Sequence, residues 1–139
     1  MKLEIWDVRY EIFDKSNEKW QSDMKKLRDL EVYQLAEELS DLIWREFDGW
    51  NRKAQNTIGY QLIRSCDSIA ANLAEGYGRY STADRKRFYI YARGSFEETK
   101  CWLRKAIRRG IIDEKSVTEY TRIIDELGPK LNGFIRSTR

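Results

Sequence analysis

Apolar residues recur at steps of three and four along most of this chain, which is the spacing of amphipathic helices. The first predicted helix spans residues 26–47 and ends before Gly49 and a polar stretch. The second spans residues 55–75. Gly76 and Gly78 are expected to end it, because glycine readily adopts the left-handed geometry that closes a helix.

The third predicted helix begins after Ser81, a typical N-cap residue that is followed three residues later by Asp84. Its pattern continues to Arg109 and stops at Gly110, a second glycine-terminated end. This is the longest predicted helix, and it carries most of the candidate chemistry.

A fourth helix is predicted to start at Ser116, which forms a capping box with Glu119, and to run to about Phe134. Gly128-Pro129 lies inside this pattern, so a kink or a break is expected there. Short connections between long helices favour antiparallel neighbours. The predicted fold is therefore all-α, an antiparallel up-and-down four-helix bundle formed by residues 26–139.

Residues 1–25 form a separate N-terminal arm. Apolar residues from Trp6 to Ile12 alternate with charged ones, and this period of two predicts a β-strand. A single strand is not stable by itself in water, so the arm is expected to pack against the bundle or against another chain.

Composition narrows the possible chemistry. The 139 residues suit one domain, and a hydrophobic content of 41% supports a buried core. Histidine is absent, which removes histidine-based triads and almost every zinc site. The acidic cluster Glu37, Glu38 and Asp41 is predicted on a polar face without neighbours that perturb it. Cys66 falls among core positions and Cys101 on an exposed side, so no enzyme activity, cofactor or metal is predicted.

A cytoplasmic location is expected. The longest uninterrupted apolar run, Phe88 to Ala92, is too short to span a membrane. Residues 1–14 mix acids and bases without the apolar segment of a signal peptide. Two cysteines in such a chain are typical of free thiols in a reducing compartment.

Charge is concentrated in one segment. Residues 79–109 contain ten basic and three acidic residues, a balance of +7, although the whole chain carries only +3. Such a segment is the electrostatic signature of a protein that binds an anionic partner. The alternative is a solvated helix face that acids on neighbouring helices neutralise.

A helical wheel places four basic residues of the third helix on the same side as Lys86, within about 40° of it. We call these five residues the basic stripe: Lys86, Arg93, Lys100, Arg104 and Arg108. An apolar arc of roughly 160° lies on the other side, wider than one core-facing stripe needs. One part of this arc is expected to face the bundle and the other a neighbouring subunit, unless the N-terminal arm covers it.

Several polar residues of the second and third helices are assigned structural roles. In an antiparallel hairpin, Glu98 is predicted to hold Arg64, and the small pair Gly94-Ser95 to allow close helix approach. Asn72 is expected to bond backbone groups of the turn after Gly76. Arg79 either pairs with Glu75 or binds a phosphate, and the tyrosines near it are candidates for stacking on bases. These tyrosines are Tyr77, Tyr80 and Tyr89.

Five sequence stretches carry a family resemblance: Leu30-Glu-Val-Tyr-Gln-Leu-Ala36, Gln61-Leu-Ile-Arg64, Ser68-Ile69, Asn72-Leu-Ala-Glu-Gly-Tyr-Gly-Arg79 and Gly94-Ser95 with Glu98. Over about residues 27–135 the chain resembles the proteins encoded by intervening sequences of 23S rRNA genes. Relatives of that family include the accessory variability determinant of diversity-generating retroelements, which partners a reverse transcriptase. The loop at residues 48–56 and the N-terminal arm depart from the usual pattern.

The resemblance implies a homopentameric barrel that binds nucleic acid and has no enzymatic activity. Combined with the basic stripe, it predicts an oligomeric accessory protein that binds RNA or an RNA/DNA hybrid, with a reverse transcriptase as a candidate partner. The alternative is a protein–protein adaptor that docks an acidic partner and uses its aromatic arm as an anchor.

Overall fold

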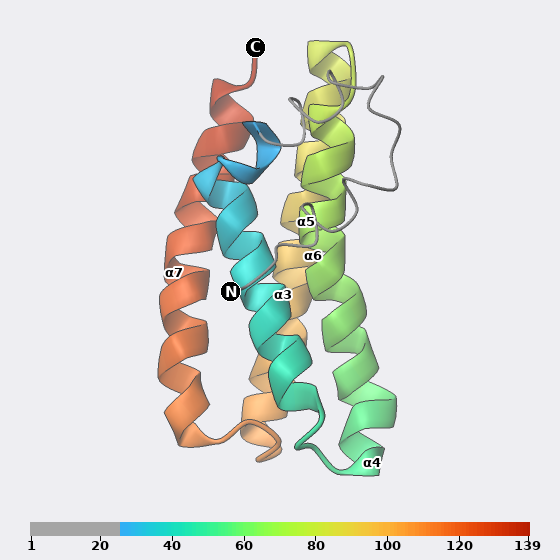
Figure 1. Cartoon of the computed structure of the whole chain (residues 1–139), viewed down its shortest axis with the longest axis vertical. Coiled ribbons are helices and arrows are strands. Elements are labelled where there is room, and N and C mark those ends of the chain that lie inside the picture. Colours follow the sequence, from blue (N-terminus) through green and yellow to red (C-terminus); the bar gives the residue numbers. More distant parts are fainter. Residues whose placement is uncertain (1–25) are drawn as a thin grey trace, which may run out of the picture.

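The computed structural model describes residues 26–139, and the regular structure within this range is helical. Four long helices lie side by side in a bundle (Figure 1). They are α3 (Glu31–Phe47), α5 (Tyr60–Tyr77), α6 (Thr82–Arg108) and α7 (Glu114–Ser137). Two short elements, α4 (Arg52–Ala54) and the π-helix η2 (Gln55–Gly59), lead directly into α5. The strand predicted in the N-terminal arm falls outside the described residues.

The first two helices differ from the prediction at their starts. Helix α3 begins at Glu31 rather than at residue 26, because Leu30 has extended backbone angles (φ −75°, ψ 125°) and separates α3 from the helical turn before it. The second helical segment begins earlier than predicted, where the Asn51 side chain accepts a hydrogen bond from the Ala54 N–H at 2.9 Å. Within η2, a Cβ atom at Gly59 would lie 2.7 Å from the Phe47 ring, so glycine is needed there for close packing.

The glycines act in two different ways. Gly110 follows the end of α6 with a positive φ of 71°, as predicted. The expected left-handed geometry at Gly76 and Gly78 is wrong, since α5 continues through Gly76 and Gly78 caps it with a φ of −80°. Gly76 is instead a close-packing residue, because a Cβ atom there would lie 2.6 Å from the ring of Tyr89 on α6.

The caps of the last two helices confirm one prediction and correct another. Ser81 caps α6 as predicted, with its hydroxyl accepting from the Asp84 N–H at 3.1 Å. Helix α7 starts earlier than expected, because the Asp113 carboxylate caps it by accepting from the Ser116 N–H at 3.0 Å.

Helix α7 continues without a break through Pro129. Pro129 is exposed, so water can solvate the Asp125 carbonyl group, which has lost its helical donor.

The core is formed by aliphatic and aromatic side chains from all four long helices. Tyr120 of α7 is buried, and its hydroxyl donates to the Glu46 carboxylate of α3 at 2.9 Å. Cys66 is fully buried, as predicted, and burial raises the pKa of its thiol to about 12. This thiol is therefore protonated at neutral pH and acts as a small core residue.

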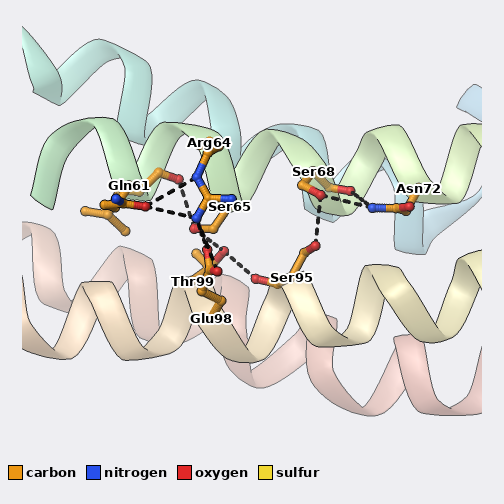
Figure 2. Close-up of polar contacts among 9 residues, drawn as sticks. Gln61, Arg64, Ser65, Ser68, Asn72, Ser95, Glu98 and Thr99 are labelled. Atoms are coloured by element: carbon orange, nitrogen blue, oxygen red, sulfur yellow. Dashed lines mark hydrogen bonds and ion pairs between the residues drawn. The ribbon is translucent and has the colours of Figure 1, made fainter.

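A ladder of polar side chains joins α5 to α6 (Figure 2). The hydroxyl group of Thr99 donates to Ser65 at 3.1 Å, and the hydroxyl groups of Ser68 and Ser95 are 2.9 Å apart. Asn72 extends the ladder by donating to the Ser68 carbonyl at 2.8 Å. The prediction that Asn72 serves the turn after Gly76 is therefore wrong, because its amide bonds one turn back within its own helix.

The order of these contacts gives the direction of α6 relative to α5. As residue numbers rise along α5 from Arg64 through Ser68 to Gly76, the partners on α6 fall from Glu98 through Ser95 to Tyr89. The close approach predicted at Gly94 is wrong: this residue is exposed, and a Cβ atom there would meet nothing within 4 Å. Only Ser95 of the predicted small pair lies in the contact.

Candidate nucleic-acid interface

The basic stripe lies along α6 at the edge of its buried face. Arg93, Arg104 and Arg108 are exposed, whereas Lys86 and Lys100 are half-buried. The buried residues of α6 are Tyr89, Ala92, Phe96, Thr99, Leu103 and Ala106. At 100° per residue, their mean direction is about a quarter-turn from the stripe rather than opposite to it. The core-facing side of α6 is thus displaced from the centre of the predicted apolar arc.

Ion pairs between helices distinguish the stripe from two basic residues of α7. On α7, Lys130 pairs with Glu31 of α3 at 2.5 Å, and Arg122 pairs with Glu38 of α3. Within residues 26–139, the stripe has one ion pair, between Lys100 and Glu97 of the same helix at 2.9 Å. No acid of another described helix forms an ion pair with the stripe, so four of its five positive charges are unpaired within residues 26–139.

The predicted pairs at the motif residues are present. Arg64 bonds the Glu98 carboxylate at 2.9 Å and the Gln61 side chain at 2.9 Å (Figure 2). Arg79 pairs with Glu75 at 2.7 Å, and its guanidinium lies 4.6 Å from the centroid of the Phe88 ring. The Arg79 guanidinium is therefore engaged in two contacts, unlike the exposed arginines of the stripe.

The three tyrosines considered for base stacking lie in different environments. Tyr80 is fully exposed, and Tyr77 is half-buried. Tyr89 is only 2% exposed, packs 4.6 Å from the Phe134 ring, and sits against Gly76. The stacking hypothesis is therefore wrong for Tyr89, whose ring fills the space that a glycine leaves open.

The bundle leaves part of the apolar arc of α6 uncovered. Tyr91 is 50% exposed and contacts the half-buried Phe88 edge to face, with 5.6 Å between ring centroids. Trp102 is also half-buried, and its indole N–H is enclosed without an acceptor among the described residues. On the helical wheel these three aromatic side chains share one side of α6. Ser95, which contacts Ser68 of α5, lies on the same side.

One acid of the α3 cluster, Glu37, has a perturbed pKa, contrary to the prediction. Burial raises the pKa of Glu37 above its ordinary value, and the nearby carboxylates of Asp41 and Asp67 raise it further. Sequence spacing along α3 does not reveal Asp67, because this residue belongs to α5. No metal-binding cluster of acids and cysteines is present between residues 26 and 139. Cys101 is exposed, as predicted.

The sequence interpretation missed a groove between α6 and α7, about 310 Å³ in volume. Two stripe residues, Arg93 and Lys100, line it together with Asp125 and Asn132 of α7. The available signal is the Gly128-Pro129 pair, which lines the groove and from which the sequence predicts only a kink or a break. No described helix is long and apolar enough to cross a membrane.

These features define a small helical-bundle protein with one unneutralised basic helix face. The chain belongs to the 23S rRNA-intervening sequence protein family, whose sequence model matches residues 28–133. This match confirms the family resemblance and covers the four long helices almost completely. The comparison with curated proteins gave no significant match.

Proposed function

We propose that this chain is a non-enzymatic accessory protein that binds nucleic acid, with RNA favoured, along the basic stripe of α6. The observation that carries this proposal is the lack of cross-helix ion pairs at the stripe, measured over residues 26–139. Arginine and lysine side chains left free in this way neutralise phosphates and supply affinity that depends little on base sequence. The name of the family supports RNA as the ligand.

The proposed protein is an assembly of antiparallel up-and-down bundles. The order of the contacts between α5 and α6 supports the antiparallel arrangement. The half-exposed Tyr91 beside Phe88 supports assembly, because an aromatic flank of this kind is stabilised when a second copy covers it. Resemblance to the family suggests five copies, and resemblance to the accessory variability determinant suggests a reverse transcriptase as partner.

The assembly is tested by measuring the mass in solution with light scattering. The proposal predicts five times the 16.6 kDa mass of one chain. Tyr91→Asp places a charge on the aromatic flank and is expected to release single chains with unchanged helical content. A wild-type protein that has the mass of one chain at all concentrations would refute the assembly.

RNA binding is tested by charge reversal. The variant Arg93→Glu, Lys100→Glu and Arg104→Glu removes the centre of the stripe and is expected to abolish binding. The matched control reverses three exposed basic residues elsewhere, Arg45, Lys115 and Arg136. Both variants have the same net charge, so a purely nonspecific effect of charge weakens binding equally in both. Equal affinities of the two variants would exclude the stripe as the binding site.

A further inference from the structure

The groove between α6 and α7 has a buried aromatic ring beneath it and an exposed proline ring in its lining. The aromatic ring is that of Phe96 on α6, which is only 3% exposed. On α7, a Cβ atom at Gly128 would lie 3.4 Å from the Phe96 ring, so glycine brings the α7 backbone close to this ring. Pro129 follows Gly128 and is exposed, so its ring is an apolar surface that a ligand in the groove can contact.

One basic and one acidic residue remain unpaired at this groove. Lys100 is engaged, since its ammonium group pairs with Glu97 and lies 5.0 Å from the centroid of the Phe96 ring. Arg93 of α6 and Asp125 of α7 form no ion pair or side-chain hydrogen bond within residues 26–139. A ligand in the groove thus meets a free guanidinium on one wall and a free carboxylate on the other.

Pro129 adds a further acceptor. It has no backbone N–H, so the carbonyl group of Asp125, four residues earlier, loses its regular helical donor. The α7 wall therefore carries the carboxylate and the carbonyl of Asp125, with the amide of Asn132 two turns beyond this residue. This wall is rich in acceptors, which match a ligand that presents N–H donors.

We propose that the groove binds an unpaired guanine nucleotide of an RNA strand that lies on the basic stripe; this inference rests on the proposed RNA binding. Guanine presents two adjacent N–H donors on its pairing edge, and these match the two oxygens of the Asp125 carboxylate. The phosphate lies at Arg93, which is both a stripe residue and a groove residue. The base covers the exposed ring of Pro129.

The other bases fit this wall less well. Uracil places its single N–H between two carbonyl oxygens, which a carboxylate repels. Adenine and cytosine each carry an exocyclic amine but no second N–H donor beside it. Inosine keeps the ring N–H of guanine and lacks the amine, so it retains one of the two hydrogen bonds.

The experiment compares single-stranded RNAs of about ten nucleotides, a length within the range that single-strand-binding sites cover. One strand contains only uridine, and the others carry one central guanosine, inosine or adenosine. Fluorescence anisotropy measures the dissociation constants for the full chain. We expect the guanosine strand to bind about tenfold more tightly than the uridine strand, with inosine between them, because a bidentate base contact has this magnitude.

Two variants separate base recognition from charge. Asp125→Asn is expected to lose the preference for guanosine and to keep its affinity for the uridine strand. Glu119→Gln removes the same charge from an exposed position of α7 outside the groove and is expected to keep the preference. Wild-type protein that binds all strands equally, or Asp125→Asn that retains the preference, overturns this inference and leaves RNA binding intact. Failure to bind any strand overturns both proposals.

Discussion

Gly76→Ala tests how closely α5 and α6 approach each other. The new Cβ atom would lie 2.6 and 2.8 Å from two carbons of the Tyr89 ring and 3.0 Å from the Arg85 carbonyl oxygen. Neither neighbour moves easily. The Tyr89 ring is buried against Phe134, and the Arg85 oxygen belongs to the backbone of α6. The two helices must therefore shift apart to accept a single methyl group.

The expected loss of stability is the difference between two opposing effects. Overpacking a close contact costs about 1–3 kcal/mol. Alanine recovers up to about 1 kcal/mol of this cost, because it favours the helix more than glycine does. Since both a buried ring and a backbone oxygen are too close, we expect Gly76→Ala to lower the free energy of unfolding by about 1–2 kcal/mol.

Gly94→Ala is the matched control, because this position lies within α6 and a Cβ atom there meets nothing within 4 Å. Only the propensity effect remains, so this variant is expected to gain up to about 1 kcal/mol. Urea unfolding, followed by far-ultraviolet circular dichroism at one protein concentration, measures both changes. Gly76→Ala that is as stable as Gly94→Ala would refute the close contact at Gly76.

Three further predictions concern the buried and half-buried polar groups. Glu37→Gln is expected to stabilise the protein at pH 7, because the folded state raises the pKa of Glu37 and therefore disfavours its charged form. The folded wild type binds the Glu37 carboxyl proton more tightly than the unfolded chain does, so the urea midpoints of wild type and variant should converge as the pH falls towards 4.5. A difference that widens as the pH falls would contradict this prediction. Thr99→Val removes the hydroxyl that donates to Ser65, while the Ser65 hydroxyl still donates to the Leu62 carbonyl, so the variant should lose about 0.5–1.5 kcal/mol in urea unfolding. Thr99→Ser keeps the hydroxyl and should be milder, so equal losses would exclude the hydroxyl contact. A thiol reagent should label Cys101 in the native protein and reach Cys66 only after unfolding, so rapid labelling of both would refute the buried position of Cys66.

Helix existence was predictable because the spacing of apolar residues is a local property. The sequence indicated all four long helices, and Ser81 and Gly110 marked the two ends of α6 correctly. The starts of α3 and α7 were harder to predict. The extended backbone of Leu30 sets the first and the side-chain cap of Asp113 the second, and several neighbouring residues could also supply either feature. Pro129 does not break α7, because its position is exposed and tertiary packing continues on both sides of it.

Contacts between helices were only partly predictable. Arg64 and Glu98 were paired correctly from the register of a simple hairpin, which places opposite charges at the same level. The same reasoning failed at Gly94, because register does not state which side of a helix faces its neighbour. Asp67 and Asp125 were missed for the same reason: their surroundings come from a second helix, and no pattern within one helix reveals them.

The salt dependence of RNA binding tests the central claim most directly. If the five stripe residues each neutralise one phosphate, the logarithm of affinity falls with the logarithm of salt with a slope of about −3.5 for single strands. This corresponds to a loss of about 100-fold between 50 and 200 mM salt.

The variant Arg93→Gln, Lys100→Gln and Arg104→Gln retains two stripe residues, and its slope should fall to about −1.4, a loss of about sevenfold over the same range. Fluorescence anisotropy across a salt series gives both slopes in one experiment. A reduced slope in the variant, with helical content unchanged, is the result that the basic stripe predicts. The same slope in both proteins, or no binding at 50 mM salt, would contradict it.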